Sequence, residues 1–204
     1  WDVFDRDGKE AVKAGLSSTH KRDFLEGFSI TDGVELHNEK FKELVFLKKG
    51  FLPFPNLVLT AGAPKTGKSW FVLGLAEELT QNDHTVVYIS NEDTTRRLQA
   101  RYKKVSDFPS KKLVFISGIS SNKPLPKGEA GLAFISALKR QYPDLKCVIV
   151  DTIQAIRNPD LKQDYANVEN EFSVIRKLAH KLEITIIGVH HTKKTTDFET
   201  TPID

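Results

Sequence analysis

The chain has 204 residues, enough for one full hydrophobic core or a core with a small appendage, which argues against two large domains. Its 30 basic and 27 acidic residues give a net charge of +3, so no chain-wide field points to a polyanionic partner. A single cysteine, Cys147, excludes an internal disulfide, and no leader-like or long apolar segment occurs, which predicts a soluble protein of a reducing compartment without a membrane partner.

The first 40 residues mix charged and turn residues without a strand pattern, and we expect a connector there. From residue 41 the composition becomes more apolar. A hairpin is predicted there by apolar runs at 44–47 and 51–52, which Lys48, Lys49 and Gly50 separate. The chain lacks methionine and begins at Trp1, so we interpret it as a piece of a longer polypeptide. The expected organisation is therefore a connector over 1–40 and a main domain over 41–204 that is truncated at its C-terminal end.

Apolar periodicity predicts the elements of the main domain. Strands are expected at 56–60, 85–90, 113–117, 147–151 and 184–189, and helices at 69–80, 94–105, 130–141 and 168–182. In the first of these helices one apolar face is expected to hold Phe71, Val72, Leu75, Ala76 and Leu79. Alternation of strands with helices of this length indicates right-handed βαβ units, hence an α/β fold with a mainly parallel sheet covered by helices on both faces.

A phosphate-binding motif lies between the first of these strands and the first of these helices. Residues 62–69 fit the pattern G-x-x-x-x-G-K-S/T in the strand–turn–helix setting that the pattern requires. Backbone N–H groups of such a loop surround phosphate oxygens, Lys68 would reach the β- and γ-phosphates, and the Ser69 hydroxyl would bind Mg²⁺. We therefore expect ATP and Mg²⁺ as cofactors, with nucleotide contacts from Gly62, Ala63, Pro64, Lys65, Thr66, Gly67, Lys68, Ser69 and Trp70.

Three further strands end in residues that suit this chemistry, at the sheet edge where ligands of such folds bind. Asp151 follows four apolar residues and is expected to hold a metal-bound water beside Ser69. The next residue is Thr152, so a hydrolytic base does not directly follow this acid. Glu92 could polarise the attacking water, and His190 and His191 could sense the γ-phosphate. An exposed loop acid at Glu92 and a zinc site at the His pair are the alternatives.

These motifs, in order and spacing, resemble the RecA-like ATPases of the RepA type, within the hexameric replicative-helicase superfamily that includes DnaB. Four segments carry the resemblance: residues 62–69, residues 88–93 together with Arg96 to Leu98, residues 150–152, and residues 189–193. The similarity covers residues 41–194. The first 40 residues resemble, more loosely, the connector that follows a primase domain.

The resemblance implies an ATP-hydrolysing motor of a replicative helicase that acts on single-stranded DNA as a homo-hexameric ring, in the cytoplasm of a bacterial, archaeal or phage-infected cell. It implies that Lys68 binds phosphate and that Ser69 and Asp151 bind Mg²⁺. It also implies that Glu92 is the catalytic base and that His190 and His191 sense the γ-phosphate. A primase domain on the same chain would fit the connector. The arginine that a neighbouring subunit supplies in this family lies beyond the end of the sequence.

Two other functions stay open at this stage. One is a RecA-like recombinase or mediator that coats DNA without unwinding it, and the other is a P-loop kinase that phosphorylates a small molecule. The acids and the His pair favour hydrolysis over transfer. Lys193 and Lys194, in a Thr-rich stretch after the His pair, are candidates for a DNA-gripping loop, with solvated lysines as the alternative.

Overall fold

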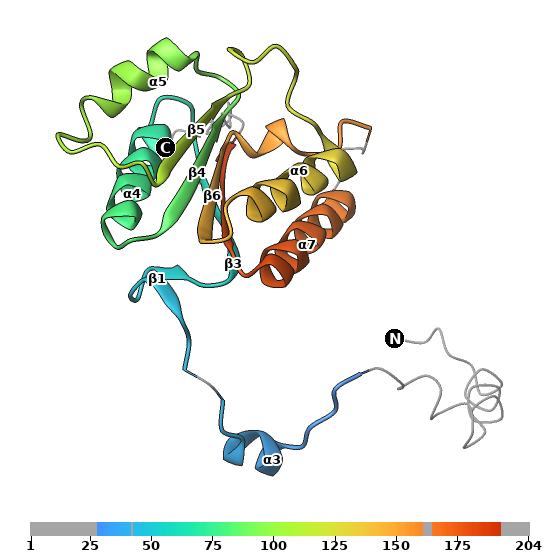
Figure 1. Cartoon of the computed structure of the whole chain (residues 1–204). Coiled ribbons are helices and arrows are strands. Elements are labelled where there is room, and N and C mark those ends of the chain that lie inside the picture. The colour runs from blue at the N-terminus through green and yellow to red at the C-terminus, as the bar shows by residue number, and fades with distance from the viewer. Residues whose placement is uncertain (1–27, 42, 161–164, 193–204) are drawn as a thin grey trace, which may run out of the picture. The chain divides into compact units, whose positions relative to one another are not determined.

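The computed structural model describes residues 28–41, 43–160 and 165–192, which fall into two units that divide between residues 43 and 44 (Figure 1). Among its described residues the first unit contains one short helix, α3 (Gly33–Asn38), which the sequence analysis did not anticipate. The carboxylate of Asp32 caps it by accepting hydrogen bonds from the backbone N–H groups of Val34 and Glu35, at 2.8 and 2.9 Å. None of its residues is buried, so within this unit the helix depends on its cap rather than on packing.

The second unit begins with the expected hairpin. Strands β1 (Phe46–Lys48) and β2 (Leu52–Pro53) pair antiparallel around a turn in which Gly50 has a φ of 69°, a left-handed conformation that glycine adopts without a Cβ clash. The carbonyl of Pro53 accepts a hydrogen bond from the Thr185 hydroxyl (2.8 Å), which ties the hairpin to the start of the last strand of the main sheet.

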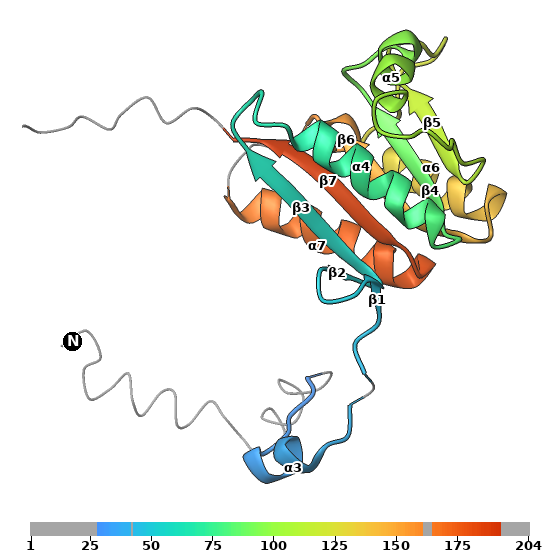
Figure 2. The same ribbon diagram turned by 90° about the vertical axis from the view of Figure 1, so that its left-hand side faces the viewer.

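The main sheet has five parallel strands in the order β3-β7-β6-β4-β5, as the α/β prediction required. Figure 2 shows β3 at one edge beside β7. The strands are β3 (Asn56–Gly62), β4 (Thr85–Ser90), β5 (Leu113–Ser117), β6 (Leu145–Asp151) and β7 (Thr185–His191). The helices between them are α4 (Lys68–Gln81), α5 (Thr95–Tyr102), α6 (Gly128–Gln141) and α7 (Tyr165–Leu182), with a short 3₁₀ turn, η1 (Ile153–Ala155), after β6.

Two hydrophobic cores lie on opposite faces of this sheet. Tyr88 and Ile149 point to the face covered by α4 and α5, whereas Val87 and Val148 point to the face covered by α6 and α7 (Figure 1). Side chains of a strand alternate between faces, so a strand with helices on both sides must be apolar throughout. Burial of each such side chain contributes about 1.5–3 kcal/mol before the entropy of ordering is counted. This is why the apolar runs identified these strands in the sequence.

Two predictions along the elements are corrected. Phe71 does not face the core but is 50% exposed and meets Phe51 edge-on, with ring centroids 6.0 Å apart, because its place on α4 turns it toward the β1–β2 turn. Strand β7 runs to His191 instead of ending at 189, since its pairing with β3 continues through Ala61 opposite His190 and Gly62 opposite His191.

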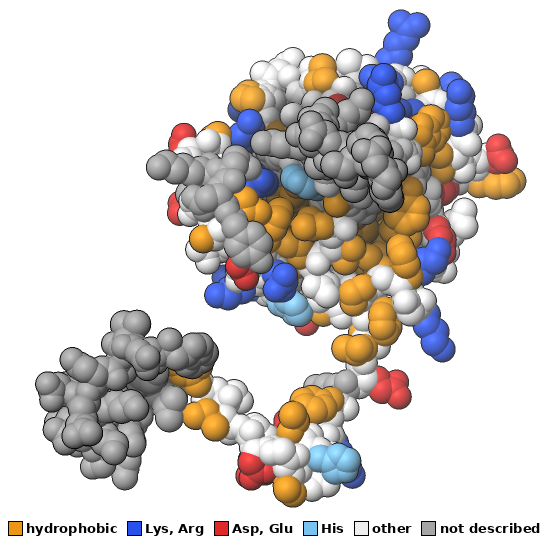
Figure 3. All heavy atoms as spheres, turned by 180° about the vertical axis from the view of Figure 1, so that it is seen from behind, with side chains coloured by type: hydrophobic (Ala, Val, Ile, Leu, Met, Phe, Trp, Pro, Cys, Tyr) orange, Lys and Arg blue, Asp and Glu red, His pale blue; other side chains and the backbone are white. Residues whose placement is uncertain are grey.

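Some large apolar side chains of the second unit remain at the surface, and Figure 3 shows hydrophobic side chains gathered on the face that is seen from behind. Exposed large apolar residues of this unit include Leu44, Val45, Phe51, Leu59 and Phe71. No helix in the described part of the chain is long and apolar enough to cross a membrane.

Candidate nucleotide site

The loop between β3 and α4 has the backbone that its glycines predict. Gly67 has a φ of 90° and precedes the first residue of α4, and no atom lies within 4 Å of a Cβ placed there, so the conformation rather than space requires glycine. Lys65 also has a positive φ, 67°. The loop thus turns sharply into the N-terminus of α4, where free N–H groups and the helix dipole favour an anion.

Lys68 lies across the inside of this loop. Its side chain is buried apart from 8% of its surface, and its Nζ donates hydrogen bonds to the carbonyl oxygens of Gly62 (2.8 Å) and Ala63 (2.7 Å). The Thr66 hydroxyl oxygen lies 3.4 Å from the same nitrogen. Phosphate oxygens would be stronger acceptors for this ammonium than the two carbonyls.

A pocket of about 410 Å³ opens in front of the loop, within the size range of small-molecule sites. Four cationic side chains and one carboxylate line it, which favours an anionic ligand. The lining residues are Pro64, Lys65, Gly67, Lys68, Ser69, Trp70, Glu92, Arg97, Arg101 and His191. Six residues predicted from the motif therefore share one cavity with Glu92, which follows β4, and with the last residue of β7, whereas Gly62, Ala63 and Thr66 are not among the lining residues.

Glu92 and His191 face each other across this pocket. The Oε1 of Glu92 lies 3.4 Å from Nε2 of His191, and the carboxylate keeps 55% of its side-chain surface exposed. The Nδ1 atom of His191 is buried without a hydrogen-bond partner in the described structure. A solvent-accessible carboxylate beside an imidazole can orient a water molecule and accept its proton.

The two histidines have different surroundings. His190 is not among the residues that line the pocket, and its Nδ1 lies 2.6 Å from the side-chain amide nitrogen of Gln154. Partial burial, together with the nearby Arg157, His191 and Lys68, lowers the pKa of His190. Successive residues of a strand point to opposite faces, which separates the neighbours that the sequence treated as one sensor.

An arginine clamp beside Glu92 was missed by the sequence analysis. Asp93, 2% exposed, forms ion pairs with Arg97 (3.0 Å) and with Arg101, both from α5. The backbone of Asp93 is also fixed, because its N–H donates to the Ser90 hydroxyl (3.1 Å) and its carbonyl accepts from the Ser117 hydroxyl (2.7 Å). The available signal was an acid followed by arginines four and eight residues later, a spacing that places both on one side of a helix.

Trp70 connects the phosphate loop to the same helix. The guanidinium of Arg101 lies 5.7 Å from the centroid of the Trp70 ring, within the range of a cation–π contact, and 42% of Trp70 is exposed. Arg101 therefore contacts Asp93 on one side and Trp70 on the other. The two cationic residues of α5 that line the pocket are thus held in place. Asp93, next to Glu92, holds both Arg97 and Arg101, and Trp70 also contacts Arg101.

Asp151 is buried at the end of β6, and its two carboxylate oxygens differ. Oδ2 accepts a hydrogen bond from the Tyr88 hydroxyl (2.8 Å), whereas Oδ1 is buried with no partner in the described structure. Burial and the neighbouring carboxylate raise the pKa of Tyr88, so its hydroxyl stays protonated and donates. A buried carboxylate oxygen without a donor is a suitable acceptor for a cation or its bound water, and Mg²⁺ prefers such hard oxygen ligands.

Two other predictions concern metals and DNA. No group of three or more His, Cys, Asp or Glu side chains that could hold a metal ion occurs in the described ranges, and Mg²⁺ needs only one or two protein oxygens beside a nucleotide. Lys193 and Lys194 lie outside the described residues.

The strand order, the loop after β3 and the acid that ends β6 define a RecA-like P-loop ATPase domain. The model of an AAA domain family, AAA_25, matches residues 33–197, and the chain belongs to this family. This match and the fold likenesses below confirm the resemblance and the fold class that the motifs indicated.

Solved structures that share the fold include the following two. One is an ATPase domain that is 16% identical with a TM-score of 0.53, over 94% of this chain and 73% of that chain. A DnaB-like replicative helicase, described with its interactions with primase, is 18% identical with a TM-score of 0.54. This match covers 96% of this chain and 57% of that chain. The DNA repair protein RadA of Streptococcus pneumoniae (strain ATCC BAA-255 / R6) is 27% identical over 143 residues, which is 68% of this chain. The chain spans only 30% of the length of that relative.

Proposed function

We propose that this chain is the ATP-hydrolysing motor domain of a replicative DNA helicase that acts on single-stranded DNA as a ring. The observation that carries the proposal is the convergence of Lys68, Glu92 and His191 on one pocket at the carboxyl edge of a RecA-like sheet. The likeness of the fold to a DnaB-like replicative helicase directs the choice among RecA-like functions.

In this proposal ATP binds with its phosphates in the loop of residues 62–69. The Lys68 ammonium turns from the carbonyls of Gly62 and Ala63 to the β- and γ-phosphates. The Ser69 hydroxyl and the free oxygen of Asp151 would hold Mg²⁺, which neutralises phosphate charge when bound. Trp70, next to the loop and in the pocket, would contact the nucleotide beyond the phosphates.

Hydrolysis then needs a water in line with the γ-phosphate. Glu92 accepts a proton from this water, the water oxygen bonds to the γ-phosphorus, and the bond to the oxygen of the β-phosphate breaks. His191, 3.4 Å from Glu92, senses whether the γ-phosphate is present by donating or releasing a hydrogen bond. His190, directed at Gln154, has no part in this contact.

Assembly and DNA are further parts of the proposal. A homo-hexamer would place each pocket at an interface, where a neighbouring subunit could add the arginine that stabilises transition-state charge. The basic residues of the segment after β7, Lys193 and Lys194, would contact the DNA backbone. A primase domain joined to the chain is the remaining partner that the family likeness suggests.

A recombinase or mediator ATPase is the second candidate, because the DNA repair protein RadA is 27% identical over 143 residues. Both functions use the same ATP site, so the pocket does not distinguish them. A small-molecule kinase is less well supported, since the carboxylate–imidazole contact beside the loop suits activation of water.

The deciding experiment measures strand displacement and strand exchange with the full-length protein that contains this domain. ATP-dependent displacement of a labelled strand without exchange supports the helicase, and exchange without displacement supports the recombinase. Lys68→Ala serves as the control, because it removes the ammonium that the loop holds for the phosphates and should abolish ATP turnover. Retained turnover in that variant would contradict the assignment of this loop as the active phosphate site.

A further inference from the structure

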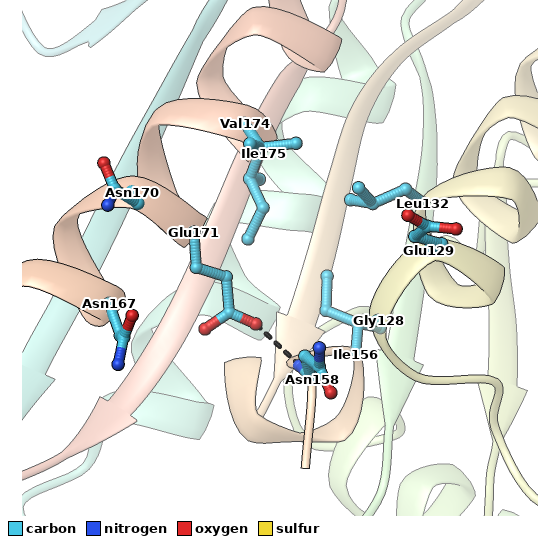
Figure 4. A pocket seen from close by; sticks show the side chains of 10 residues that line it. All are labelled: Gly128, Glu129, Leu132, Ile156, Asn158, Asn167, Asn170, Glu171, Val174 and Ile175. Atoms are coloured by element: carbon cyan, nitrogen blue, oxygen red, sulfur yellow. Dashed lines mark hydrogen bonds between the residues drawn. The ribbon is translucent and has the colours of Figure 1, made fainter. Parts of the chain in front are cut away.

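A second pocket lies on the other face of the sheet, between α6, α7 and the segment that follows η1 (Figure 4). Its volume is about 270 Å³, and no residue lines both this cavity and the nucleotide pocket. Its walls are apolar and come from Leu132 of α6, Ile156 after η1, and Val174 and Ile175 of α7. Val174 remains 49% exposed, so apolar surface is open to a partner there.

The floor of this pocket is a fixed polar network. The Oε2 of Glu171 accepts a hydrogen bond from Nε of Arg157 (2.6 Å), and both side chains are at least nine-tenths buried. The other oxygen of Glu171 accepts from the backbone N–H of Asn158 (2.6 Å), a contact drawn in Figure 4. The Arg157 guanidinium also lies 5.4 Å from the ring centroid of Phe172. Arg157 thus neutralises the charge of the Glu171 carboxylate. Glu171 therefore contributes to the shape of the pocket and adds no net charge to it.

The rim of this pocket supplies the remaining charge and hydrogen-bonding groups. Asn158, Asn167 and Asn170 also line the pocket, and the Oδ1 of Asn158 already accepts a hydrogen bond from the backbone N–H of Asp160 (3.0 Å), whereas Glu129 brings an exposed carboxylate. Glu129 lies in the first turn of α6, where the helix dipole alone favours an acid. The dipole does not account for the three asparagines that line the same cavity.

Charge and size restrict the ligand. Within the described part of the chain no lysine or arginine lines this cavity, so it lacks the cations that a phosphate or a nucleotide would need. Its volume is just below the range of about 300–1,000 Å³ that holds whole small-molecule ligands, which suits one long side chain better. Among the described lining residues, the exposed carboxylate of Glu129 and the aliphatic walls match a cation carried on an aliphatic stem.

We propose that this pocket binds an arginine or lysine side chain presented by a partner polypeptide. The aliphatic stem packs against Val174 and Leu132, and the cationic end donates hydrogen bonds to the Glu129 carboxylate at the rim. Gly128 N–H donates to the carbonyl of Ile156 (2.9 Å), and a Cβ placed on Gly131 would come within 3.0 Å of that same carbonyl. The segment after η1 is therefore packed closely on α6, and the pocket is formed before any partner binds.

The test uses the 15N-labelled 204-residue chain and two peptides, N-acetyl-leucyl-arginine amide and its citrulline counterpart, which keeps the shape but removes the charge. The arginine peptide should shift the side-chain amide signals of Asn158, Asn167 and Asn170, and it should bind about five-fold more tightly than the citrulline peptide, as expected for a charge-assisted hydrogen bond. Equal affinity for both peptides, or no shift at these signals, overturns the proposal.

Matched variants separate the site from general effects. Glu129→Gln should weaken arginine-peptide binding about five-fold and remove the preference over citrulline. Val174→Lys should abolish binding by placing a cation at the opening. Glu169→Gln changes an exposed acid of α7 that does not line the pocket, and this variant should bind the arginine peptide with unchanged affinity. Thermal unfolding of each variant verifies folding. If a thymidine oligonucleotide, rather than the peptide, shifts the same amide signals, the proposal is wrong.

Discussion

The hydroxyl of Tyr88 on β4 donates a hydrogen bond to Oδ2 of Asp151 on β6, at 2.8 Å, in the interior of the sheet. The two strands are neighbours, and their register pairs Tyr88 with Ile149 and Ser90 with Asp151. One carboxylate oxygen is thus held by the protein and the other is left for a ligand. Tyr88 acts as a positioning residue for the acid that we propose to hold Mg²⁺.

Tyr88→Phe removes this donor and should lower the free energy of unfolding by about 1–3 kcal/mol, the range for leaving a buried acceptor without its partner. It should also change the Mg²⁺ concentration that gives half-maximal ATP turnover, while nucleotide binding measured without Mg²⁺ stays the same. Urea unfolding and Mg²⁺ titrations measure the two effects. Tyr142→Phe is the control, since its hydroxyl makes no hydrogen bond in the described structure. An unchanged Mg²⁺ titration would show that Tyr88 does not position Asp151 for Mg²⁺.

Glu92→Gln keeps the shape of the side chain but removes the proposed base. Nucleotide affinity should stay nearly unchanged while kcat falls by about 100-fold or more. Stopped-flow binding of a fluorescent ATP analogue and steady-state phosphate release measure the two quantities, with Glu169→Gln as an exposed acid outside the pocket for comparison. If affinity falls and kcat holds, Glu92 is a binding residue and the base lies elsewhere.

Asp93→Asn tests the arginine clamp. The substitution leaves Arg101 without its buried anion and should destabilise the domain by about 2–4 kcal/mol, near the range for breaking one partner of a buried ion pair. Affinity for ATP should fall too, because Arg97 and Arg101 line the nucleotide pocket. A double-mutant cycle with Arg101→Gln isolates the pair in urea unfolding. Additive effects of the two changes would show that the pair contributes no coupling energy.

His190 should make stability depend on pH. A protonated ring carries hydrogen on both nitrogens, so its Nδ1 could no longer accept from the Gln154 amide. Because folding lowers the pKa of His190 below its unfolded value of about 6.5, the unfolded chain binds more protons between these two values. Stability should therefore rise with pH up to about 6.5 and then level off. His190→Asn should reduce this slope in urea unfolding at a series of pH values, and His180→Asn, at an exposed position, should not.

Lys193→Ala with Lys194→Ala tests the proposed grip on DNA. In the assembled protein the double variant should bind single-stranded DNA more weakly regardless of base sequence. The slope of log K against log salt should shrink by about 0.7 for each DNA phosphate that the variant no longer binds. Fluorescence anisotropy with labelled oligonucleotides over a salt series gives both values. An unchanged slope would mean that these lysines do not contact the DNA backbone.

The parts of the fold that follow from local pattern could be predicted. The apolar runs that became β4 and β6 are buried on both faces, and the loop at 62–69 depends on glycines whose spacing is visible in the sequence. Phe71 was misplaced because helical spacing alone does not show which side the core occupies once a hairpin packs nearby.

Some parts of the site depend on the face of a strand to which a side chain points, or on contacts between strands. These parts could not be predicted from the sequence. His190 and His191 are adjacent in sequence, and the pairing of β7 with β3 shows that both lie within the strand, where successive side chains point to opposite faces. Tyr88 looked like an ordinary residue of an apolar strand, because its hydroxyl finds a partner 63 residues later. Arg97 and Arg101 lie in a helix that the sequence predicted, but their role could not be seen without the contacts of the buried Asp93.

The place of Trp70 also makes the nucleotide pocket optically observable. The chain has two tryptophans, Trp1 and Trp70, so a Trp1→Phe variant emits from the pocket alone. The indole stands between the phosphate loop and the guanidinium of Arg101, and its emission reports any change in that contact. Nucleotide binding, the arginine clamp and the state of α5 can then be followed in real time without a dye attached to protein or ligand.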